Sequence, residues 1–341
     1  MALQYNRLGK SDLYVSEIAM GGSVPRADSF GSSNFHRSYT DALAAAYDLG
    51  INFFDTAESY GDGWSEMLLR RAFGHRRHCV IIGSKVSHEH LQPQEVRKAC
   101  EKSLQRLGTD YLDIYYVHFP NDAVPLSDTI GTMMDLKAEG KIRSVGLCNF
   151  SRSQLEEAIH LGRIDALQQC YSLMWRRYAE TELKPVCIEH TVSMVPFSPL
   201  AVGLLSGKFT PATEFDASDQ RGRPENTGIV IFRKQWFDSC VSSVDQMKPI
   251  AAKYGKTVSQ LALNWVRSQE GVHSVVSGAK SAAQIEQNVG SAGWEIETED
   301  RRSLELISSA ITDRLPAYLH FFSKMIDTNR TVQGSIQRRA P

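Results

Sequence analysis

Residues 51–66 read INFFDTAESYGDGWSE, which places a carboxylate and then a tyrosine directly after a short apolar run. The run is rich in β-branched and aromatic residues, as is typical of a strand buried on both faces. Asp55 ends it, turn-forming residues lead to Tyr60, and a helical pattern opens at Ser65. In α/β proteins the chemistry lies at the carboxyl ends of such strands. The stretch alone predicts either a catalytic loop or an ordinary strand-to-helix turn.

The chain has 341 residues, 42% hydrophobic and 23% charged, with a formal net charge of −1. That is enough to bury one barrel-sized core or two smaller ones. The near-neutral charge argues against nucleic acid or an anionic membrane as the main partner, and no window is long and apolar enough to span a bilayer. The N-terminal segment has no apolar signal region, and the six cysteines form no C-x-x-C pair. We therefore expect a soluble cytoplasmic protein with free thiols.

A strand pattern followed by a helical pattern recurs along most of the chain, and three capping patterns, Ser151-x-x-Gln154, Thr257-x-x-Gln260 and Ser281-x-x-Gln284, mark helix starts. Eight such units in one domain predict a (β/α)8 TIM barrel. An open doubly wound sheet is the alternative, but it requires a Gly-x-Gly-x-x-Gly turn, which the Gly-Gly-Ser-Val of residues 21–24 does not supply. The expected strands are Ile18–Met20, Ile51–Asp55, Val80–Lys85, Asp113–Val117, Ser144–Cys148, Ala166–Tyr171, Ser193–Phe197 and Ser274–Ser277.

Three segments lie outside this alternation. Residues 3–15 predict an N-terminal β-hairpin around Gly-Lys-Ser-Asp. Residues 207–234 are rich in Pro, Gly, Asp and Arg and predict a long loop, which a helix from about Val241 follows. The chain ends in a polar, basic tail. We expect one barrel domain, residues 1–315, and a C-terminal extension, residues 316–341.

The expected strand ends carry ionisable groups on three consecutive strands, namely Asp55, Lys85 and His118, with Tyr60 on the loop after the first. A tyrosine has an ordinary pKa of about 10, and a nearby lysine cation lowers it. Asp55 would hold the Lys85 ammonium, because a buried charge needs a partner. His118 would orient a substrate carbonyl. The set suits proton donation to a carbonyl oxygen while a hydride arrives at carbon, although any one of these residues alone could be a structural ion pair.

Over roughly residues 3 to 310 the chain resembles the aldo-keto reductase superfamily. The motif D-T-A-x-x-Y-G-x-x-x-x-E is complete from Asp55 to Glu66. The segments IIGSKV, YYVHFP, GKIRSVGLCNFS, QQCYSLMWRR, VPFSPLAVGLLSGKF and VVSGAKSAAQIEQNVGS follow in family order. The arrangement is similar to that of the longer, bacterial-type members.

This resemblance implies that Tyr60 is the general acid, tuned by Lys85 and Asp55, and that His118 orients the carbonyl. It also implies a nicotinamide cofactor, with NADP(H) preferred to NAD(H). The cofactor-binding residues that it implies are Asn149 and Gln168 at the carboxamide, Phe197 on the nicotinamide ring, Ser198, Leu200, Gly203 and Leu205 along the pyrophosphate, and Ser277, Gly278, Lys280, Ser281, Gln284, Gln287 and Asn288 at the adenosine end.

Three residues depart from the pattern of many family members. Cys148 replaces a serine, which weakens one polar contact, and Phe197 replaces a tyrosine, which keeps the stacking surface and removes a hydroxyl. Gln284 replaces an arginine near the adenine 2′-phosphate, which leaves Lys280 as the nearest cation.

We therefore expect an NADPH-dependent carbonyl reductase or alcohol dehydrogenase that acts on an aldehyde, ketone or sugar-like small molecule. The alternatives are a cofactor-binding regulatory subunit and a metal-dependent hydrolase on the same barrel. Trp64, Trp175 and Trp236 are expected on loops at the substrate pocket. His88-x-His90 has metal-ligand spacing, but no third ligand is evident, so no metal is expected. The physiological substrate and the oligomeric state are not specified by the sequence.

Overall fold

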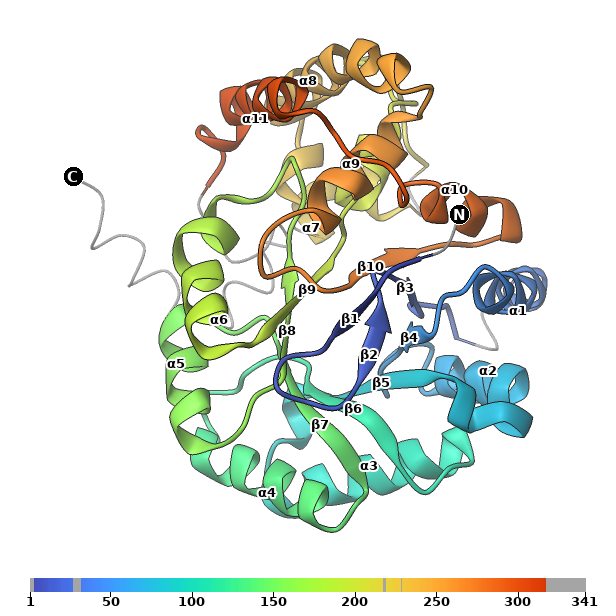
Figure 1. The fold of residues 1–341 in the computed structure, drawn as a ribbon, viewed down its shortest axis with the longest axis vertical. Coiled ribbons are helices and arrows are strands. Elements are labelled where there is room, and N and C mark those ends of the chain that lie inside the picture. Colours follow the sequence, from blue (N-terminus) through green and yellow to red (C-terminus); the bar gives the residue numbers. More distant parts are fainter. Residues whose placement is uncertain (1–2, 27–31, 217–218, 228, 317–341) are drawn as a thin grey trace.

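In a computed structural model of the protein, residues 3–26, 32–216, 219–227 and 229–316 are described (Figure 1). The expected C-terminal extension therefore lies outside the described residues from position 317 onward. All six cysteines lie within the described ranges; they form no disulfide, and five are buried. Among the described helices, none is both long enough and apolar enough to cross a membrane.

Eight parallel strands form a nearly closed barrel in the order β10-β3-β4-β5-β6-β7-β8-β9 (Figure 1). Between its two ends, β9 and β10, an isolated parallel bridge joins Met194 to Val272. The architecture confirms the (β/α)8 prediction, and each expected strand is present within a few residues of its predicted bounds. The strands are β3 (Ile18–Gly21), β4 (Phe53–Asp55), β5 (Ile81–Val86), β6 (Leu112–Val117), β7 (Ile142–Cys148), β8 (Ala166–Cys170), β9 (Ser193–Phe197) and β10 (Val275–Gly278).

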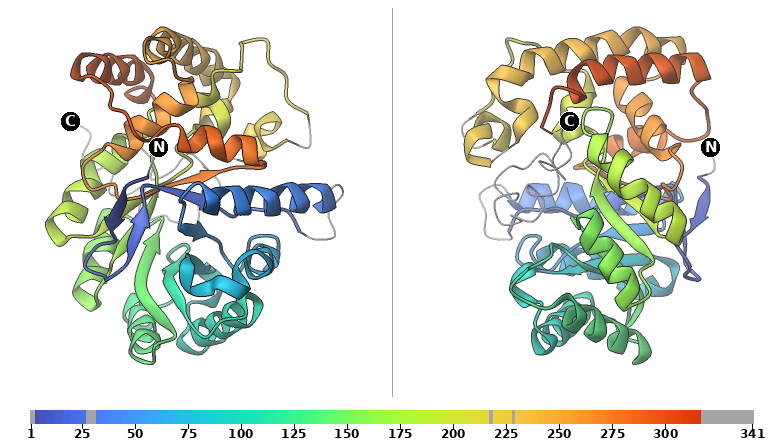
Figure 2. Two further views of the ribbon diagram at one scale, coloured as in Figure 1. Left: turned by 45° about the vertical axis from the view of Figure 1, so that its right-hand side comes forward. Right: turned by 90° about the vertical axis from the view of Figure 1, so that its left-hand side faces the viewer.

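Helices surround the barrel, and α8 and α11 lie side by side along one edge of it (Figure 2). The helices are α1 (Ser32–Asp48), α2 (Trp64–Phe73), α3 (Pro93–Leu107), α4 (Leu126–Ala138), α5 (Arg152–Leu161), α6 (Lys184–His190, after a π-helical turn at Ala179–Leu183), α7 (Pro224–Thr227), α8 (Lys234–Lys253), α9 (Val258–Arg267), α10 (Ala282–Val289) and α11 (Thr298–Thr312). Short 3-10 turns occupy Gly74–Cys79, His88–His90, Ala201–Ser206, Gln220–Gly222 and Val230–Phe232.

The main differences from the predicted elements lie after residue 207. The segment expected to be a long loop contains α7 and two short 3-10 turns, and α8 begins at Lys234 rather than near Val241. No side chain caps the start of α8, so the sequence carries no start signal there. Its first turn is held instead by tertiary contacts, because Phe237 packs against Phe209, Phe215 and Phe232.

The N-terminal hairpin, β1 (Tyr5–Arg7) and β2 (Tyr14–Ser16), is present as predicted and crosses the amino end of the barrel (Figure 1). Two side chains of the barrel accept hydrogen bonds from its backbone: Gly9 N donates to Ser193 Oγ at 2.6 Å, and Ser16 N donates to Asn52 Oδ1 at 2.8 Å. Hairpin residues Leu8, Leu13 and Val15 join the apolar cluster inside the barrel. The hairpin therefore closes the base of the barrel, and the opposite end carries the candidate site.

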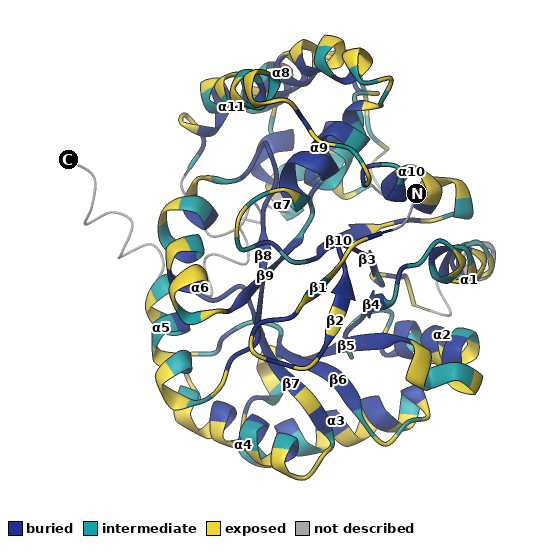
Figure 3. Ribbon diagram, viewed as in Figure 1, coloured by how far each residue is buried: buried dark blue, intermediate teal, exposed yellow. Residues whose placement is uncertain are grey.

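The barrel strands are mostly buried (Figure 3). Buried apolar residues form two separate clusters, a large one that includes the strand–helix interfaces and a small one inside the barrel. Tyr116 has the largest side chain of the inner cluster. A Cβ on Gly146 would lie 2.2 Å from this ring, and one on Gly83 would lie 3.1 Å from it. Glycine at both positions therefore makes room for the ring beneath the candidate site.

Candidate active site

Four of the predicted site residues come together at the carboxyl end of the barrel. Asp55 ends β4, Lys85 lies in the neighbouring β5, and His118 directly follows β6. The buried Lys85 Nζ donates to Asp55 Oδ2 at 2.7 Å and to the Thr56 carbonyl oxygen at 2.7 Å. It lies 4.8 Å from the centre of the Tyr60 ring, whose centroid is 5.6 Å from that of His118. A tyrosine, an ammonium group and an imidazole therefore share one edge of the barrel.

The loop that carries Tyr60 has an unusual backbone. Gly61, Asp62 and Gly63 have φ values of 60°, 59° and 81°, a left-handed conformation that glycine adopts readily. A Cβ on Gly61 would lie 2.7 Å from the carbonyl oxygen of Pro25. Close approach of the segment after β3 therefore fixes this loop.

His36 holds the same region together, although no sequence pattern selects it. Its Nδ1 accepts a hydrogen bond from Trp64 Nε1 at 2.9 Å, so its Nε2 carries the proton and donates to the Pro25 carbonyl oxygen at 3.0 Å. The side chain links α1 to α2 and to the segment after β3. A single buried histidine has no local pattern that would reveal this link.

The pKa of Tyr60 differs in direction from the sequence-based expectation. The net pKa is raised to about 12, because burial of the phenol raises it, Lys85 lowers it, and Asp55 and Cys148 raise it. The expected lowering by Lys85 is present, but burial and Asp55 outweigh it, so the pKa does not fall below its ordinary value. Tyr60 is a protonated phenol at neutral pH, which is the form that a proton donor needs.

The charges of the two other groups beside Tyr60 are also set by their surroundings. Burial alone would lower the pKa of Lys85, but the adjacent Asp55 raises it above its ordinary value, so this lysine is a cation. Burial, assisted by Lys85 and His88, holds the pKa of His118 well below its usual range. The imidazole is therefore neutral near pH 7 and has one N–H to donate.

Asn149 and Gln168 lie beside this group, both buried. Asn149 has a left-handed backbone, with φ of 62°, and its Nδ2 lies 3.1 Å from both the His118 carbonyl oxygen and Cys148 Sγ. Gln168 Nε2 donates to Asp55 Oδ1 at 2.5 Å, whereas Cys148 Sγ is 4.0 Å from Gln168 Oε1. Asn149 Oδ1 is buried and has no hydrogen-bond partner among the described residues. This acceptor fits a ligand with amide N–H groups, such as a nicotinamide carboxamide.

The segment after β9 contains the predicted pyrophosphate residues. Phe197, Ser198 and Leu200 are half-buried, and Leu205 is fully buried. Ser198 and Gly203 have φ values of 53° and 88°, so the chain winds tightly there. A Cβ on Gly203 would lie 3.4 Å from Arg221 Nη1, which brings a cation from the Gln220–Gly222 turn to this strip. No sequence pattern singles out Arg221, because its turn lies in the segment predicted to be a long loop.

The predicted adenosine residues surround the end of β10 and the start of α10. Ser281 caps α10, and its side chain accepts from the backbone N–H of Gln284. Gln284 Oε1 accepts from the Lys280 backbone N–H at 2.7 Å, and Asn288 Nδ2 donates to the Gly278 carbonyl oxygen at 3.3 Å. Within the described ranges, the buried Ser277 Oγ has no partner. The exposed side chains of Lys280, Gln284 and Gln287 remain accessible to a ligand.

The three predicted tryptophans occupy different settings. Trp64 is the first residue of α2, and Trp236 lies in the first turn of α8, so the prediction that these two lie on loops is wrong. Trp175 follows β8 and is 5% exposed; it lines a small surface hollow with Tyr178 and Leu315. Trp64 bonds to His36, and the Arg314 guanidinium lies 5.8 Å from the Trp236 ring.

The two closely spaced histidines have separate partners. His88 Nδ1 lies 3.3 Å from Glu89 Oε2, and His90 Nδ1 lies 2.9 Å from Glu58 Oε1. In the part of the chain that the structure describes, no group of three or more His, Cys, Asp or Glu residues could hold a metal ion.

The barrel, with a lysine, an aspartate, a histidine and a protonated tyrosine at its carboxyl end, is of the class that reduces carbonyl groups. The model of the aldo/keto reductase family matches residues 17–308, and the chain belongs to this family.

One similar protein is the NADH-specific methylglyoxal reductase of Escherichia coli K12, which is 28% identical over 89% of this chain and 98% of its own length. Two solved structures are also similar to this chain. The glycerol dehydrogenase of Gluconobacter oxydans has a TM-score of 0.81 and 26% identity, over 91% of this chain and 96% of its own. An aldo-keto reductase of Klebsiella pneumoniae in complex with NADPH has a TM-score of 0.71 and 28% identity, over 90% of this chain and 96% of its own.

Proposed function

We propose that the protein is an NADPH-dependent reductase of aldehydes, ketones or sugar-like carbonyl compounds, with Tyr60 as the proton donor. The observation that carries the proposal is the protonated Tyr60 phenol beside the Lys85–Asp55 pair and the neutral His118 ring. The cofactor, when bound, supplies a hydride to the carbonyl carbon. The protein supplies the proton to the oxygen and holds the substrate in place.

Each site residue has a distinct role in this proposal. The His118 N–H holds the carbonyl oxygen beside Tyr60, and Lys85 stabilises the phenolate that remains after the proton has moved. Asp55 keeps the ammonium group in position. In the reverse direction the Tyr60 phenolate accepts the proton of an alcohol. We expect Trp64 to form part of the substrate pocket, because it begins the helix directly after the Tyr60 loop.

The cofactor-binding residues are proposed from the family resemblance, and the buried Asn149 Oδ1 and Ser277 Oγ, which have no partner among the described residues, support the assignment. Asn149 and Gln168 bind the carboxamide, Phe197 covers the ring, and the segment from Ser198 to Leu205 follows the pyrophosphate. The residues from Ser277 to Asn288 bind the adenosine end. NADPH is preferred because Lys280 and Arg221 are cations beside this strip, with Arg221 also paired to Asp219. The Escherichia coli relative is named for NADH, and the Klebsiella pneumoniae structure contains NADPH.

The test is the loss of NADPH absorbance with a panel of aldehydes, ketones and sugars, with Tyr60→Phe measured in parallel. Turnover by the parent that falls by about 10²- to 10⁴-fold in Tyr60→Phe, with NADPH affinity within a few-fold, supports the proposal. Tight NADPH binding without turnover on any compound favours the regulatory alternative. A parent protein that binds neither NADPH nor NADH refutes the reductase proposal.

A further inference from the structure

Gln168 contacts the ion pair of the acid site directly. It lies in β8, is 1% exposed, and reaches across the barrel mouth to β4, four places away in the strand order. Its Nε2 donates to Asp55 Oδ1 at 2.5 Å, while Lys85 Nζ donates to Asp55 Oδ2 at 2.7 Å. An ionised carboxylate only accepts hydrogen bonds, and a buried one needs donors at both oxygens. Asp55 is therefore held from two sides, once by a cation and once by a neutral amide.

The orientation of Asp55 determines the direction in which Lys85 points. Two of the three N–H groups on Lys85 Nζ are used by Asp55 Oδ2 and the Thr56 carbonyl oxygen, and Nζ lies 4.8 Å from the Tyr60 ring centre. A rotation of the Asp55 carboxylate would move the ammonium group with it. We propose that Gln168 is a positioning residue of the acid site, which fixes the Asp55 carboxylate and thereby the contact of Lys85 with Tyr60.

The other end of the Gln168 amide remains available to a ligand. Among the described residues its Oε1 contacts the distant Cys148 thiol, with Sγ at 4.0 Å, and an amide oxygen accepts two hydrogen bonds. A carboxamide N–H can bind there without disturbing the bond to Asp55. This step rests on the proposed function: the same side chain then joins the cofactor site to the acid site. Asn149 is the matched control, because its amide bonds to His118 and Cys148 instead.

The sign of the expected pH effect follows from the groups around Tyr60. The phenol faces Asp55 from β4, Lys85 from β5, His118 after β6, Cys148 from β7 and Tyr39 from α1. Removal of the Gln168 N–H leaves more uncompensated negative charge on Asp55 and lets Lys85 turn toward it. Both changes disfavour the Tyr60 phenolate. Alcohol oxidation, which requires the phenolate, would then need a higher pH.

The first measurement uses the protein without cofactor. Urea midpoints are compared for Gln168→Met, Asp55→Ala and the double variant, and for Asn149→Gly with and without Asp55→Ala. We expect the Gln168 and Asp55 substitutions together to shift the midpoint by clearly less than the sum of their separate shifts, whereas the Asn149 and Asp55 shifts add. Additive shifts for Gln168 and Asp55 would refute the contact. This result does not depend on whether the protein binds NADPH.

The second measurement needs only the single variants and distinguishes positioning from simple packing. Alcohol oxidation with NADP⁺ is followed against pH for the parent, Gln168→Met and Asn149→Gly, and NADPH affinity is measured by fluorescence titration. Both variants should weaken NADPH binding by up to about tenfold. Only Gln168→Met should shift the pH at which the rate of alcohol oxidation rises, by about one unit to the alkaline side. If both variants lose the same NADPH affinity and the pH dependence of alcohol oxidation does not shift, Gln168 is a cofactor ligand only. A parent that fails to bind NADPH refutes the proposed function, and the urea comparison then decides the contact.

Discussion

The two ends of the barrel use buried charges differently. At the amino end, Glu17, Asp113 and Asp165 are almost fully buried and lie at or near the start of β3, β6 and β8. Glu17 pairs with Arg267 at 2.8 Å, and Asp165 pairs with both Lys137 and Arg163. At the carboxyl end the buried Lys85–Asp55 pair lies beside buried polar atoms that have no partner in the described structure, such as Asn149 Oδ1.

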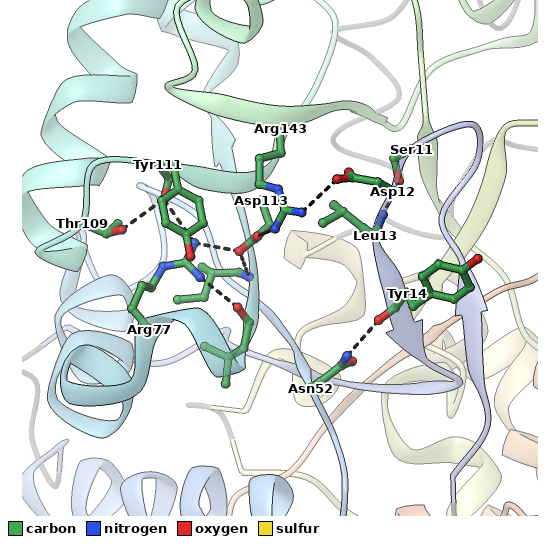
Figure 4. Close-up of polar contacts among 12 residues, drawn as sticks. Ser11, Asp12, Leu13, Tyr14, Asn52, Arg77, Thr109, Tyr111, Asp113 and Arg143 are labelled. Atoms are coloured by element: carbon green, nitrogen blue, oxygen red, sulfur yellow. Dashed lines mark hydrogen bonds and ion pairs between the residues drawn. The ribbon is translucent and has the colours of Figure 1, made fainter.

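Asp113 illustrates the amino end most fully (Figure 4). Its carboxylate accepts from Arg77 at 2.7 Å, from the backbone N–H of Ile82 at 2.9 Å, and from Arg143 at 2.8 Å. Arg143 also reaches Asp12 in the hairpin at 3.3 Å. These contacts tie β5, β6, β7 and the hairpin to one carboxylate. The amino end therefore uses its charges to hold the barrel closed, whereas the carboxyl end keeps polar groups available for a ligand.

The largest effect is expected when the ion pair at the carboxyl end is removed. This tests whether its charges serve function rather than stability. We expect Asp55→Leu combined with Lys85→Met to reduce turnover by about 10²- to 10⁴-fold. Because both charges are removed together, the free energy of unfolding should change by less than about 2 kcal/mol. Steady-state kinetics and urea unfolding check the two parts. A large loss of stability would mean that this pair, like those at the amino end, is structural.

The corresponding change at the amino end is Asp113→Ala. It removes a buried carboxylate acceptor from two arginines and from a buried N–H, so we expect a destabilisation of about 3–5 kcal/mol in urea unfolding. Turnover per folded molecule should be unchanged. Asp12→Ala, which removes the exposed member of the same cluster, serves as control and should cost less than about 0.5 kcal/mol. Similar losses of unfolding free energy in Asp113→Ala and Asp12→Ala would contradict the expectation that the buried carboxylate contributes more to stability than the exposed one.

Part of the decrease in folding stability at low pH should come from His118. Burial depresses the pKa of His118 in the folded state, while the unfolded chain titrates near its ordinary value of about 6.5. The unfolded state then binds more protons below that pH, so the contribution of His118 is present above pH 6.5 and is lost as the pH falls toward the folded-state pKa. We expect a loss of up to about 1.4 kcal/mol per pH unit. Urea unfolding at pH 7.5 and 5.5 should show a weaker pH dependence in His118→Gln, and an identical dependence in both proteins would contradict the assignment.

The smallest expected effect concerns Cys148. A serine hydroxyl is a stronger hydrogen-bond donor than the thiol that now lies 4.0 Å from Gln168 Oε1. Cys148→Ser should fix the Gln168 amide more firmly and tighten NADPH binding about threefold, as measured by fluorescence titration. Cys187→Ser is a control, because this buried cysteine lies in α6. Weaker binding in Cys148→Ser would show that the sulfur atom is required for packing.

The sequence predicted the barrel and its four central site residues for one reason: each chemical group lies at the end of an apolar strand, or on the loop directly after it. Properties that depend on contacts between distant segments were not accessible in this way. The raised pKa of Tyr60 comes from burial, and the bond between Gln168 and Asp55 crosses the barrel mouth. The start of α8 depends on packing among four phenylalanines rather than on a capping residue.

The space that Gly83 and Gly146 leave for the Tyr116 ring constrains how this sequence can change over generations. A side chain at residue 146 cannot be accommodated while the tyrosine is present, because its Cβ would lie 2.2 Å from the ring. The tyrosine must therefore be replaced by a smaller residue before the glycine can be lost. In a library that varies one position at a time, Gly146 will look invariant. A library that varies the three positions together will contain folded combinations, so these residues are inherited and engineered as a unit.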